Sequence, residues 1–286
     1  MTAVFAASTA LVRAGYPVPV RRARFGRAPG GRPDPELQLL WAERLTTDPI
    51  ARAGQGNSFS DMCEHLVAEL RATGPLDLLV LAHVTPDLDS RDSVAGALAS
   101  PELLVLAVSD QGRLAPFTAL RVAAAFPDRP HAAVIVLDQA AVPYADSDLS
   151  ALDDRADHAV ALLPALGFDP VRQWAGVTGD RVASLLDEAL RAEQPDLVIL
   201  GPALPPPAGF AWRRAPGDQL ATAVFSALSA EMADGAGTVD RTRRITVVEY
   251  EPAIRGLALV TWSEHSRPAR HLTPVPEIHP DRSHRR

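Results

Sequence analysis

The feature that most constrains the fold is a pattern that occurs twice along the chain. In each copy an amphipathic helix ends, a proline follows, and an aspartate opens an apolar strand. The first copy is ELRATGPLDLLVLAHVTPD at 69–87, and the second is ALRAEQPDLVILGPALPPP at 189–207. Continuous apolar runs such as DLLVLA and DLVILG are typical of strands covered on both faces, as in parallel sheets. The sequence therefore predicts an α/β protein in which one β/α arrangement is repeated.

The other expected elements follow the same order in both halves. Helices are expected at 58–72, 114–126, 178–192 and 217–232, and later strands at 131–138, 244–251 and 256–262. The segments TAVFAAS at 2–8 and DHAVALL at 157–163 would open the two halves. We predict an N-terminal half over 1–140, a C-terminal half over 151–265 and a disordered polar tail over 266–286. The alternative is that helix–Pro–Asp–strand is a generic α/β junction without duplication.

The composition fits a globular protein with a substantial core and excludes several classes. Of 286 residues 47% are hydrophobic, yet no apolar run approaches the roughly 18 residues of a spanning helix. The start lacks the basic segment of a signal peptide, and the single Cys63 excludes an internal disulfide framework. These features predict a cytoplasmic protein with no membrane partner. The net charge of −7 argues against broad nucleic-acid binding, and the absence of lysine excludes a Schiff-base lysine.

The stretch VLAVSDQGRLAPFTAL at 105–120 predicts a strand, a polar elbow and a helix. Its first four residues are apolar, the residues at 109–112 form the turn, and apolar residues then recur at helical spacing. A helix start offers free N–H groups to a developing negative charge, so such an elbow is a common mount for a nucleophile. The elbow is therefore the first place to look for a reactive side chain.

Three stretches resemble the thiolase superfamily, and within it the β-ketoacyl-acyl-carrier-protein synthase III branch. They are DLLVLAHVTPDLDSRDSVAGALA at 77–99, HAAVIVLDQA at 131–140 and ITVVEYEPAIRGLALVTW at 245–262. Single-residue matches are Thr85, Pro86 and Asp87 in the first stretch and Trp262 at the end of the third. The likeness covers most of residues 1–263. It implies an α/β/α/β/α layered, thiolase-like fold built from two duplicated halves.

Enzymes of that family condense acyl thioesters with an elbow cysteine, a histidine, and an asparagine or second histidine from the second half. Mapped onto this chain, the cysteine position falls between Gln111 and Leu114, where no cysteine stands. The histidine position falls in 201–207, which holds no titratable residue, and no asparagine precedes the helix at 217–232. Cys63 lies on an earlier helix with the spacing of a small core residue. The resemblance therefore implies a kept elbow without its nucleophile.

Two functional hypotheses follow from this resemblance. The first is a degenerate ketosynthase-like protein of fatty-acid or polyketide-type metabolism, acting without its own chemistry as a chain-length-factor-like partner. Its partners would be a Cys-bearing ketosynthase and an acyl carrier protein, in a homo- or heterodimer. Gln111 supports this hypothesis, because many chain-length factors have glutamine near that position. The second is an acyltransferase or malonyl decarboxylase acting on carrier-protein or CoA thioesters through Ser109, Gln111 and His83. An unrelated α/β protein with an accidental likeness remains a third reading.

Each candidate site residue also has a simpler structural interpretation. Ser109 with Asp110 suits a helix cap, and His83 suits a hydrogen-bonded residue under a loop. Three arginines, Arg21, Arg22 and Arg24, could grip the phosphate of a CoA or phosphopantetheine thioester, or keep a surface loop soluble. No other cofactor is implied. The acidic run after Thr85 lacks EF-hand spacing, so no metal site is expected.

Overall fold

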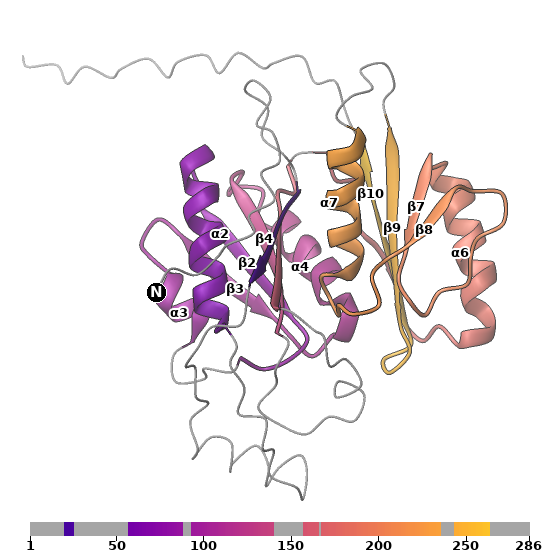
Figure 1. Ribbon diagram of the computed structural model, residues 1–286, viewed down its shortest axis with the longest axis horizontal. Helices are drawn as coiled ribbons and strands as arrows, with labels where there is room; N and C mark the ends of the chain where they lie inside the picture. The colour runs from indigo at the N-terminus through magenta and orange to yellow at the C-terminus, as the bar shows by residue number, and fades with distance from the viewer. Residues whose placement is uncertain are drawn as a thin grey trace, which may run out of the picture.

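The fold consists of two five-stranded sheets with helices between and outside them (Figure 1). The computed structural model describes residues 20–25, 57–87, 93–139, 157–165, 167–235 and 243–263. The predicted tail at 266–286 and the predicted opening strand at 2–8 lie outside these ranges.

The first sheet has the strand order β1-β5-β4-β2-β3. Strands β2, β3 and β4 run parallel, β5 runs antiparallel to β4, and β1 runs antiparallel to β5. The bounds are Val20–Phe25 for β1, Leu78–His83 for β2, Leu104–Val108 for β3, Ala132–Asp138 for β4 and Asp157–Leu162 for β5.

The second sheet repeats this topology with the order β6-β10-β9-β7-β8. Strands β7, β8 and β9 run parallel, while β10 runs antiparallel to both β9 and β6. The bounds are Arg172–Trp174 for β6, Leu197–Leu200 for β7, Trp212–Arg214 for β8, Arg244–Glu251 for β9 and Gly256–Ser263 for β10. Each strand of one sheet thus has a counterpart with the same neighbours and direction in the other.

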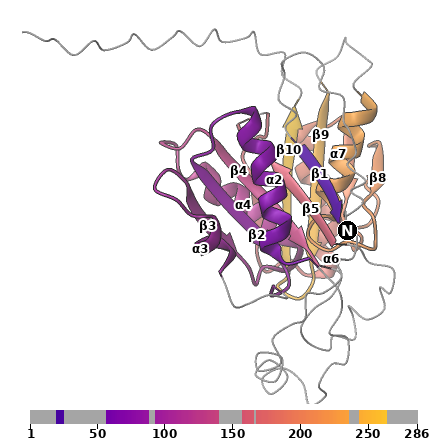
Figure 2. The same ribbon diagram turned by 60° about the vertical axis from the view of Figure 1, so that its left-hand side comes forward.

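The helices complete five layers, which Figures 1 and 2 show from two directions. Helices α2 and α3 cover the outer face of the first sheet, α4 and α7 lie between the sheets, and α6 covers the outer face of the second. Their bounds are Phe59–Thr73 for α2, Val94–Leu98 for α3, Ala115–Ala124 for α4, Gly179–Glu193 for α6 and Ala223–Gly235 for α7, with a 3-10 turn η1 at Gly112–Leu114. The predicted α/β/α/β/α order is confirmed.

The central layer is the largest apolar cluster, and it joins the two halves. Phe117 on α4 and Phe225 on α7 are fully buried, with ring centroids 5.4 Å apart. Val134 and Val247 contribute from the central strands of the two sheets. Burial of this kind is worth roughly 1.5–3 kcal/mol per large apolar side chain, so the two halves stabilise each other.

Two predictions about strands are wrong. The segment at 157–162 does not open the second half; as β5 it pairs with β1 and β4 in the first sheet. The second set of five strands therefore begins at β6. The segment that carries Arg21, Arg22 and Arg24, for which a surface loop is one of the sequence-based interpretations, forms β1. Apolar periodicity did not indicate β1, because half of its residues are arginine; its pairing with β5 defines it as a strand.

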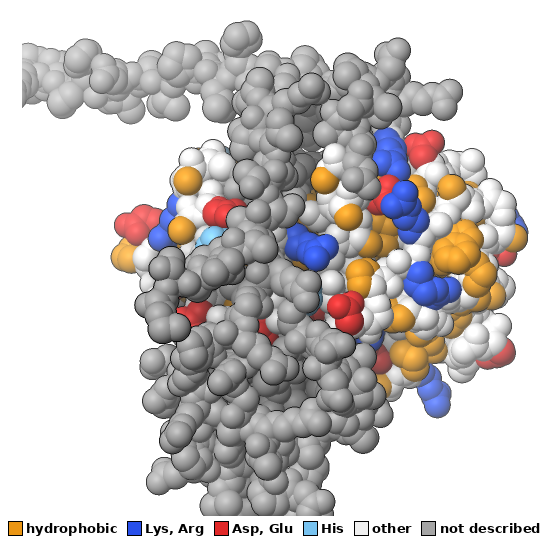
Figure 3. Space-filling model, viewed as in Figure 1, with side chains coloured by type: hydrophobic (Ala, Val, Ile, Leu, Met, Phe, Trp, Pro, Cys, Tyr) orange, Lys and Arg blue, Asp and Glu red, His pale blue; other side chains and the backbone are white. Residues whose placement is uncertain are grey.

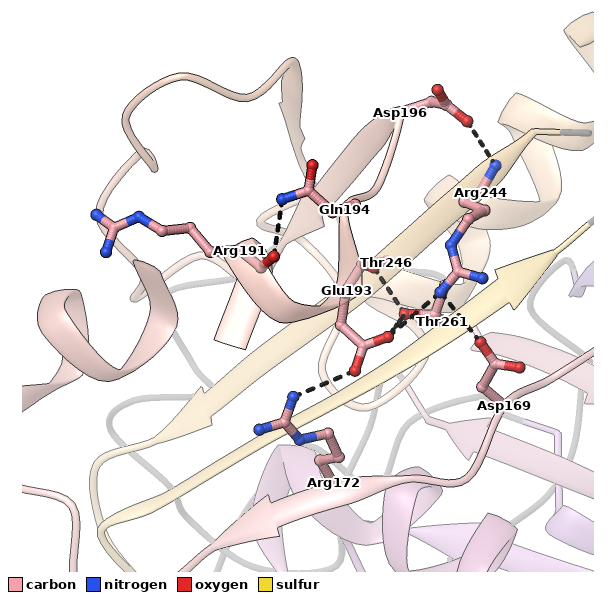
Figure 4. A network of polar contacts seen from close by, with 9 residues as sticks. All are labelled: Asp169, Arg172, Arg191, Glu193, Gln194, Asp196, Arg244, Thr246 and Thr261. Carbon is pink, nitrogen blue, oxygen red and sulfur yellow. Dashed lines mark hydrogen bonds and ion pairs between the residues drawn. The ribbon is translucent and has the colours of Figure 1, made fainter. Parts of the chain in front are cut away.

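A polar network fastens the end of α6 to the second sheet (Figure 4). The carboxylate of Glu193, the last residue of α6, accepts hydrogen bonds from Arg172 at 3.2 Å and from the Thr261 hydroxyl at 3.2 Å. Arg244 on β9 lies 3.4 Å from both Glu193 and Asp169. Each charged side chain in this cluster lies beside one of opposite charge. The network therefore has a structural role, which is to hold α6 against the second sheet.

Among the helices that the structure describes, none is both long enough and apolar enough to cross a lipid bilayer.

Candidate functional site

The elbow forms where β3 ends and the chain turns into η1 and α4. Asp110 and Gly112 have positive φ values, 59° and 51°, which turn the chain sharply before the helix. Pro116 stands in the first turn of α4, where a missing N–H costs no hydrogen bond. The predicted strand–elbow–helix is confirmed in its order.

The carboxylate of Glu251 occupies the elbow. Its Oε2 accepts a hydrogen bond from the Arg113 backbone N–H at 3.0 Å, although the two residues are 138 positions apart. A Cβ on Gly112 would lie 2.7 Å from the Glu251 carboxyl carbon. Only glycine leaves room for this approach, and the left-handed φ of residue 112 favours glycine as well.

The Arg113 side chain reaches from the elbow into the second half. Its guanidinium donates to the backbone oxygens of Gln219 at 3.1 Å and Leu220 at 3.2 Å. Those carbonyls belong to the segment that leads into α7. Arg113 therefore ties both of its ends, backbone and side chain, to the second half.

Asp138 makes the reciprocal contact from the first half. Its carboxylate accepts from the backbone N–H groups of Leu220 at 2.8 Å, Ala221 at 3.0 Å and Thr222 at 2.9 Å. It also accepts from the Thr222 hydroxyl at 2.6 Å. These N–H groups precede α7 and have no helical partner of their own. Asp138 and Glu251 end equivalent strands, β4 and β9, and each binds the helix start of the other half.

Glu249 is a buried acid beside this arrangement. Strand alternation puts it on the same face of β9 as Val247, toward the central layer. Burial raises the pKa of its carboxyl to about 8, while the Arg113 charge opposes the shift. Its Oε1 accepts from the Tyr250 N–H at 3.1 Å, and its Oε2 has no hydrogen-bond partner among the described residues. A Cβ at Gly201 would overlap the same carboxyl group.

The structure does not link Ser109 to His83. The Ser109 hydroxyl is exposed and donates to the neighbouring Asp110 carboxylate at 3.3 Å. The Nδ1 atom of His83 lies 2.8 Å from the Thr85 carbonyl oxygen, and its ring lies against Phe59 with centroids 5.0 Å apart. The hydroxyl–imidazole hydrogen bond of an activated serine is therefore not formed.

Gln111 sits at the N-cap of η1 and is half-buried. Its side chain makes no capping hydrogen bond, but its backbone oxygen accepts from the Leu114 N–H at 3.1 Å. Among the candidate residues, Gln111 lies nearest to Arg113 in the chain, and it shares the elbow with Ser109.

The three N-terminal arginines, Arg21, Arg22 and Arg24, lie on β1. Arg22 is exposed. Strand β1 lies four strand spacings from β3, or about 19 Å. The strand that carries the three arginines is therefore at the opposite edge of the first sheet from the strand that leads into the elbow.

Cys63 is a core residue, as the sequence indicates. It is fully buried on α2. Burial raises the pKa of its thiol, and the nearby charges of Asp87 and Glu64 add to the shift. A buried thiol held protonated is not a nucleophile.

Trp212 lies on the edge strand β8 and is 42% exposed. The Arg214 guanidinium carbon lies 5.7 Å from its ring centroid, and the same side chain donates to the carbonyl oxygens of Gly201 and Pro202. Figure 3 shows hydrophobic and arginine side chains gathered together over the second half. Arg214 thus anchors the proline-rich loop at 201–207.

Sequence reasoning missed Arg113, Asp138, Glu249 and Glu251. A signal existed, because three of these residues are acids at or near the end of apolar strands, in HAAVIVLD and ITVVEYE. A carboxylate in such a place must find a partner or lose its charge. The partners lie in the other half of the chain, which the sequence pattern does not identify. In the part of the chain that the structure describes, no group of three or more metal-ligating side chains is found.

Comparisons with known proteins agree with this architecture. No family model matches the sequence, and no curated protein matches it. Among solved structures, AbyA1, a tetronic acid condensing enzyme, is 13% identical over 85% of this chain and 98% of that one, with a TM-score of 0.51. A variant of Xanthomonas campestris OleA bound with cerulenin is 12% identical over 85% and 95%, with a TM-score of 0.52. The chain has a thiolase-like fold. A 3-oxoacyl-(acyl-carrier-protein) synthase III also matches, at 13% identity over 72% and 85%, with a TM-score of 0.49.

The thiolase-like fold confirms the resemblance read from the sequence. At this low identity the likeness concerns the architecture alone. The residues at the elbow and in the second half must therefore be judged by their own chemistry.

The contact between Gly112 and Glu251 can be tested by substitution. Gly112→Ala should destabilise the protein by about 2–4 kcal/mol, because a left-handed alanine costs about 1–2 kcal/mol and the crowded Cβ adds to it. Gly176→Ala is the matched control: its φ is 68°, but nothing lies within 4 Å of the added carbon. Urea unfolding of both variants measures the difference. Equal losses would show that Glu251 does not crowd the elbow.

The buried acid predicts a pH dependence of stability. The native pKa of Glu249 lies above its unfolded value of 4.5, so the native state holds the extra proton. Its contribution to the free energy of unfolding is therefore greatest below about pH 4.5 and falls as the pH rises to about 8. The variant Glu249→Gln does not ionise, so it should not lose this stability as the pH rises.

Thermal unfolding across this range gives the comparison. The melting temperature of Glu249→Gln relative to the natural chain should rise steadily between pH 5 and pH 8. A constant difference at every pH would contradict a raised pKa at Glu249.

Proposed function

We propose that this chain is a degenerate ketosynthase-like subunit that performs no condensation of its own. It pairs with an active, Cys-bearing ketosynthase in fatty-acid or polyketide-type metabolism and meets an acyl carrier protein through that pair. The observation that carries the proposal is the Glu251 carboxylate bound to the Arg113 N–H at the elbow.

A nucleophile at this elbow would lack the electrostatic support that it needs. A reactive thiolate depends on a helix N–H or a nearby cation that stabilises its negative charge. Here the Arg113 N–H is bound to a carboxylate, and the Arg113 guanidinium is bound to two carbonyl oxygens. A second negative charge at the same place would face Glu251 directly.

The second half also lacks a base in the expected place. Gly201 follows β7, and the carboxyl group of Glu249 fills the space beside it. With a pKa of about 8, this acid is mainly protonated at neutral pH. A neutral, buried carboxyl group supports a closed site rather than a group that accepts protons from a thioester substrate.

The edge strand β3 supports a role in assembly. It is the last strand of the first sheet, it leads directly into the elbow, and Leu104, Leu106 and Val108 are only half-buried. In the thiolase superfamily, the dimer interface is built around the strand beside the elbow. We therefore assign the partner subunit to β3, with a CoA or phosphopantetheine thioester bound by the partner.

Activity measurements test the absence of chemistry. The purified chain is incubated with acyl- and malonyl-carrier thioesters and with the CoA thioesters, while covalent adducts and CO₂ release are followed. We expect neither adduct nor CO₂ above the protein-free rate. Turnover that disappears in Ser109→Ala, Gln111→Ala or His83→Ala would overturn the proposal and establish the acyltransferase or decarboxylase alternative.

The β3 edge can be blocked without breaking the sheet. Leu104 bonds inward to β2, so by alternation the N–H of Ala107 faces away from β2. Ala107→Pro should therefore abolish pairing with the ketosynthase while leaving the internal ladder intact. Ala107→Thr, which keeps the N–H, is the matched control.

Co-expression and co-purification with a Cys-bearing ketosynthase, followed by light scattering, give the readout. We expect a complex with the natural chain and with Ala107→Thr, and none with Ala107→Pro. A complex that survives Ala107→Pro would place the interface elsewhere, and a natural chain that stays monomeric would contradict the assembly role.

A further inference from the structure

A cavity of about 390 Å³ lies at the far end of α4 from the elbow. It is formed by the last turns of α4, by the connection between β5 and β6, and by β10. Leu120, the lining residue of α4 nearest to the elbow, follows Leu114 by six residues, which is about 9 Å along the helix axis. The cavity therefore lies apart from the site described above, and what it binds is independent of the function proposed there.

The walls of this cavity are mostly apolar. The side chains are contributed by both halves of the chain, and the cavity is of a size that suits a small molecule. The lining residues are Leu120, Arg121, Ala124, Ala125, Pro164, Phe168, Asp169, Pro170, Val171 and Val260. Phe168 and Val171 are only half-buried. They offer apolar surface that a ligand would remove from water.

One charged side chain of the lining, Arg121, forms no ion pair with the residues that the structure describes. The guanidinium of Arg121 is exposed and uses a single N–H, which donates to the Gln173 side chain at 3.0 Å. No carboxylate of the described residues forms an ion pair with it. Asp169, the other charged residue of the lining, is already paired with Arg244 at 3.4 Å. The uncompensated charge at the rim is therefore positive.

An apolar chamber with one free guanidinium fits one class of ligand. The geometry points to a small amphipathic carboxylate whose hydrocarbon chain packs against Phe168 and Val171 while its head group binds Arg121. Arginine offers two parallel donors to a carboxylate, and each CH₂ group buried against the lining adds to the affinity. The site selects a negative head group over a positive one.

Binding of octanoate to the full chain tests the assignment, measured by titration calorimetry and by ligand-observed NMR. We expect a Kd of about 1 mM or lower. Butanoate should bind about tenfold more weakly or worse, because four CH₂ groups are lost. Octylamine, which has a similar chain but the opposite charge, should bind more weakly than octanoate.

Three variants locate the ligand. Ala124→Phe fills the cavity from an exposed helix position and should weaken octanoate by about tenfold or more. Arg121→Gln should weaken it by about threefold or more through the lost charge. Arg181→Gln, at an exposed arginine on α6, is the matched control and should bind as the natural chain does. Ala125→Phe replaces Ala124→Phe if the latter loses its native melting temperature.

Several results would each overturn the proposal. They are no octanoate binding below about 10 mM, binding that the phenylalanine variants leave unchanged, an unchanged Kd for Arg121→Gln, and octylamine binding as tightly as octanoate. Octanoate bound in another part of the molecule would be recognised because the phenylalanine variants would leave its binding unchanged.

Discussion

The fold depends on two reciprocal contacts, in each of which a carboxylate of one half binds backbone N–H groups of the other half. The last residue of β4 in the first half binds the start of α7, and the last residue of β9 in the second half binds the elbow. Backbone N–H groups at a helix start have no partner within the helix. A carboxylate that accepts hydrogen bonds from these N–H groups gives them the acceptor that they lack, and they stabilise its negative charge. Without these N–H groups the carboxylate would have no partner for its charge. Each half therefore completes the helix start of the other, and the central layer of α4 and α7 is sealed at one end by polar contacts.

Most of the architecture could be predicted from the sequence, because the central strands are continuous apolar runs and the helices are amphipathic. The closing hairpin at β9 and β10 and the layer order followed from the same patterns. The assignment of strands to sheets was harder. DHAVALL looks like any apolar strand, and nothing in its letters says that it pairs with β4 rather than opening a new sheet. VRRARF alternates polar and apolar residues over only its last four positions, which is too short a pattern to predict a strand, and it forms one by pairing with β5.

The position of the elbow could be predicted from the sequence, but the contacts that fill it could not. The elbow meets the segment before α7, because Arg113 contacts Gln219 and Leu220. Patterns for a nucleophile and its base indicated only Ser109, Gln111 and His83. The residues that fill the site pair across 82 to 138 positions of chain. Charge pairing at such separations depends on the three-dimensional arrangement and leaves no local pattern.

Gly201 and Glu249 show how closely the parts of this site constrain one another. The carboxyl group of Glu249 stands where any side chain on residue 201 would have to begin. A histidine at residue 201 would therefore require a shorter residue at 249 at the same time. A cysteine in the elbow would in turn meet the carboxylate of Glu251, which is held by the backbone of Arg113. A cysteine in the elbow and a histidine after β7 could therefore be accommodated together only if the elbow, β9 and the loop after β7 all changed.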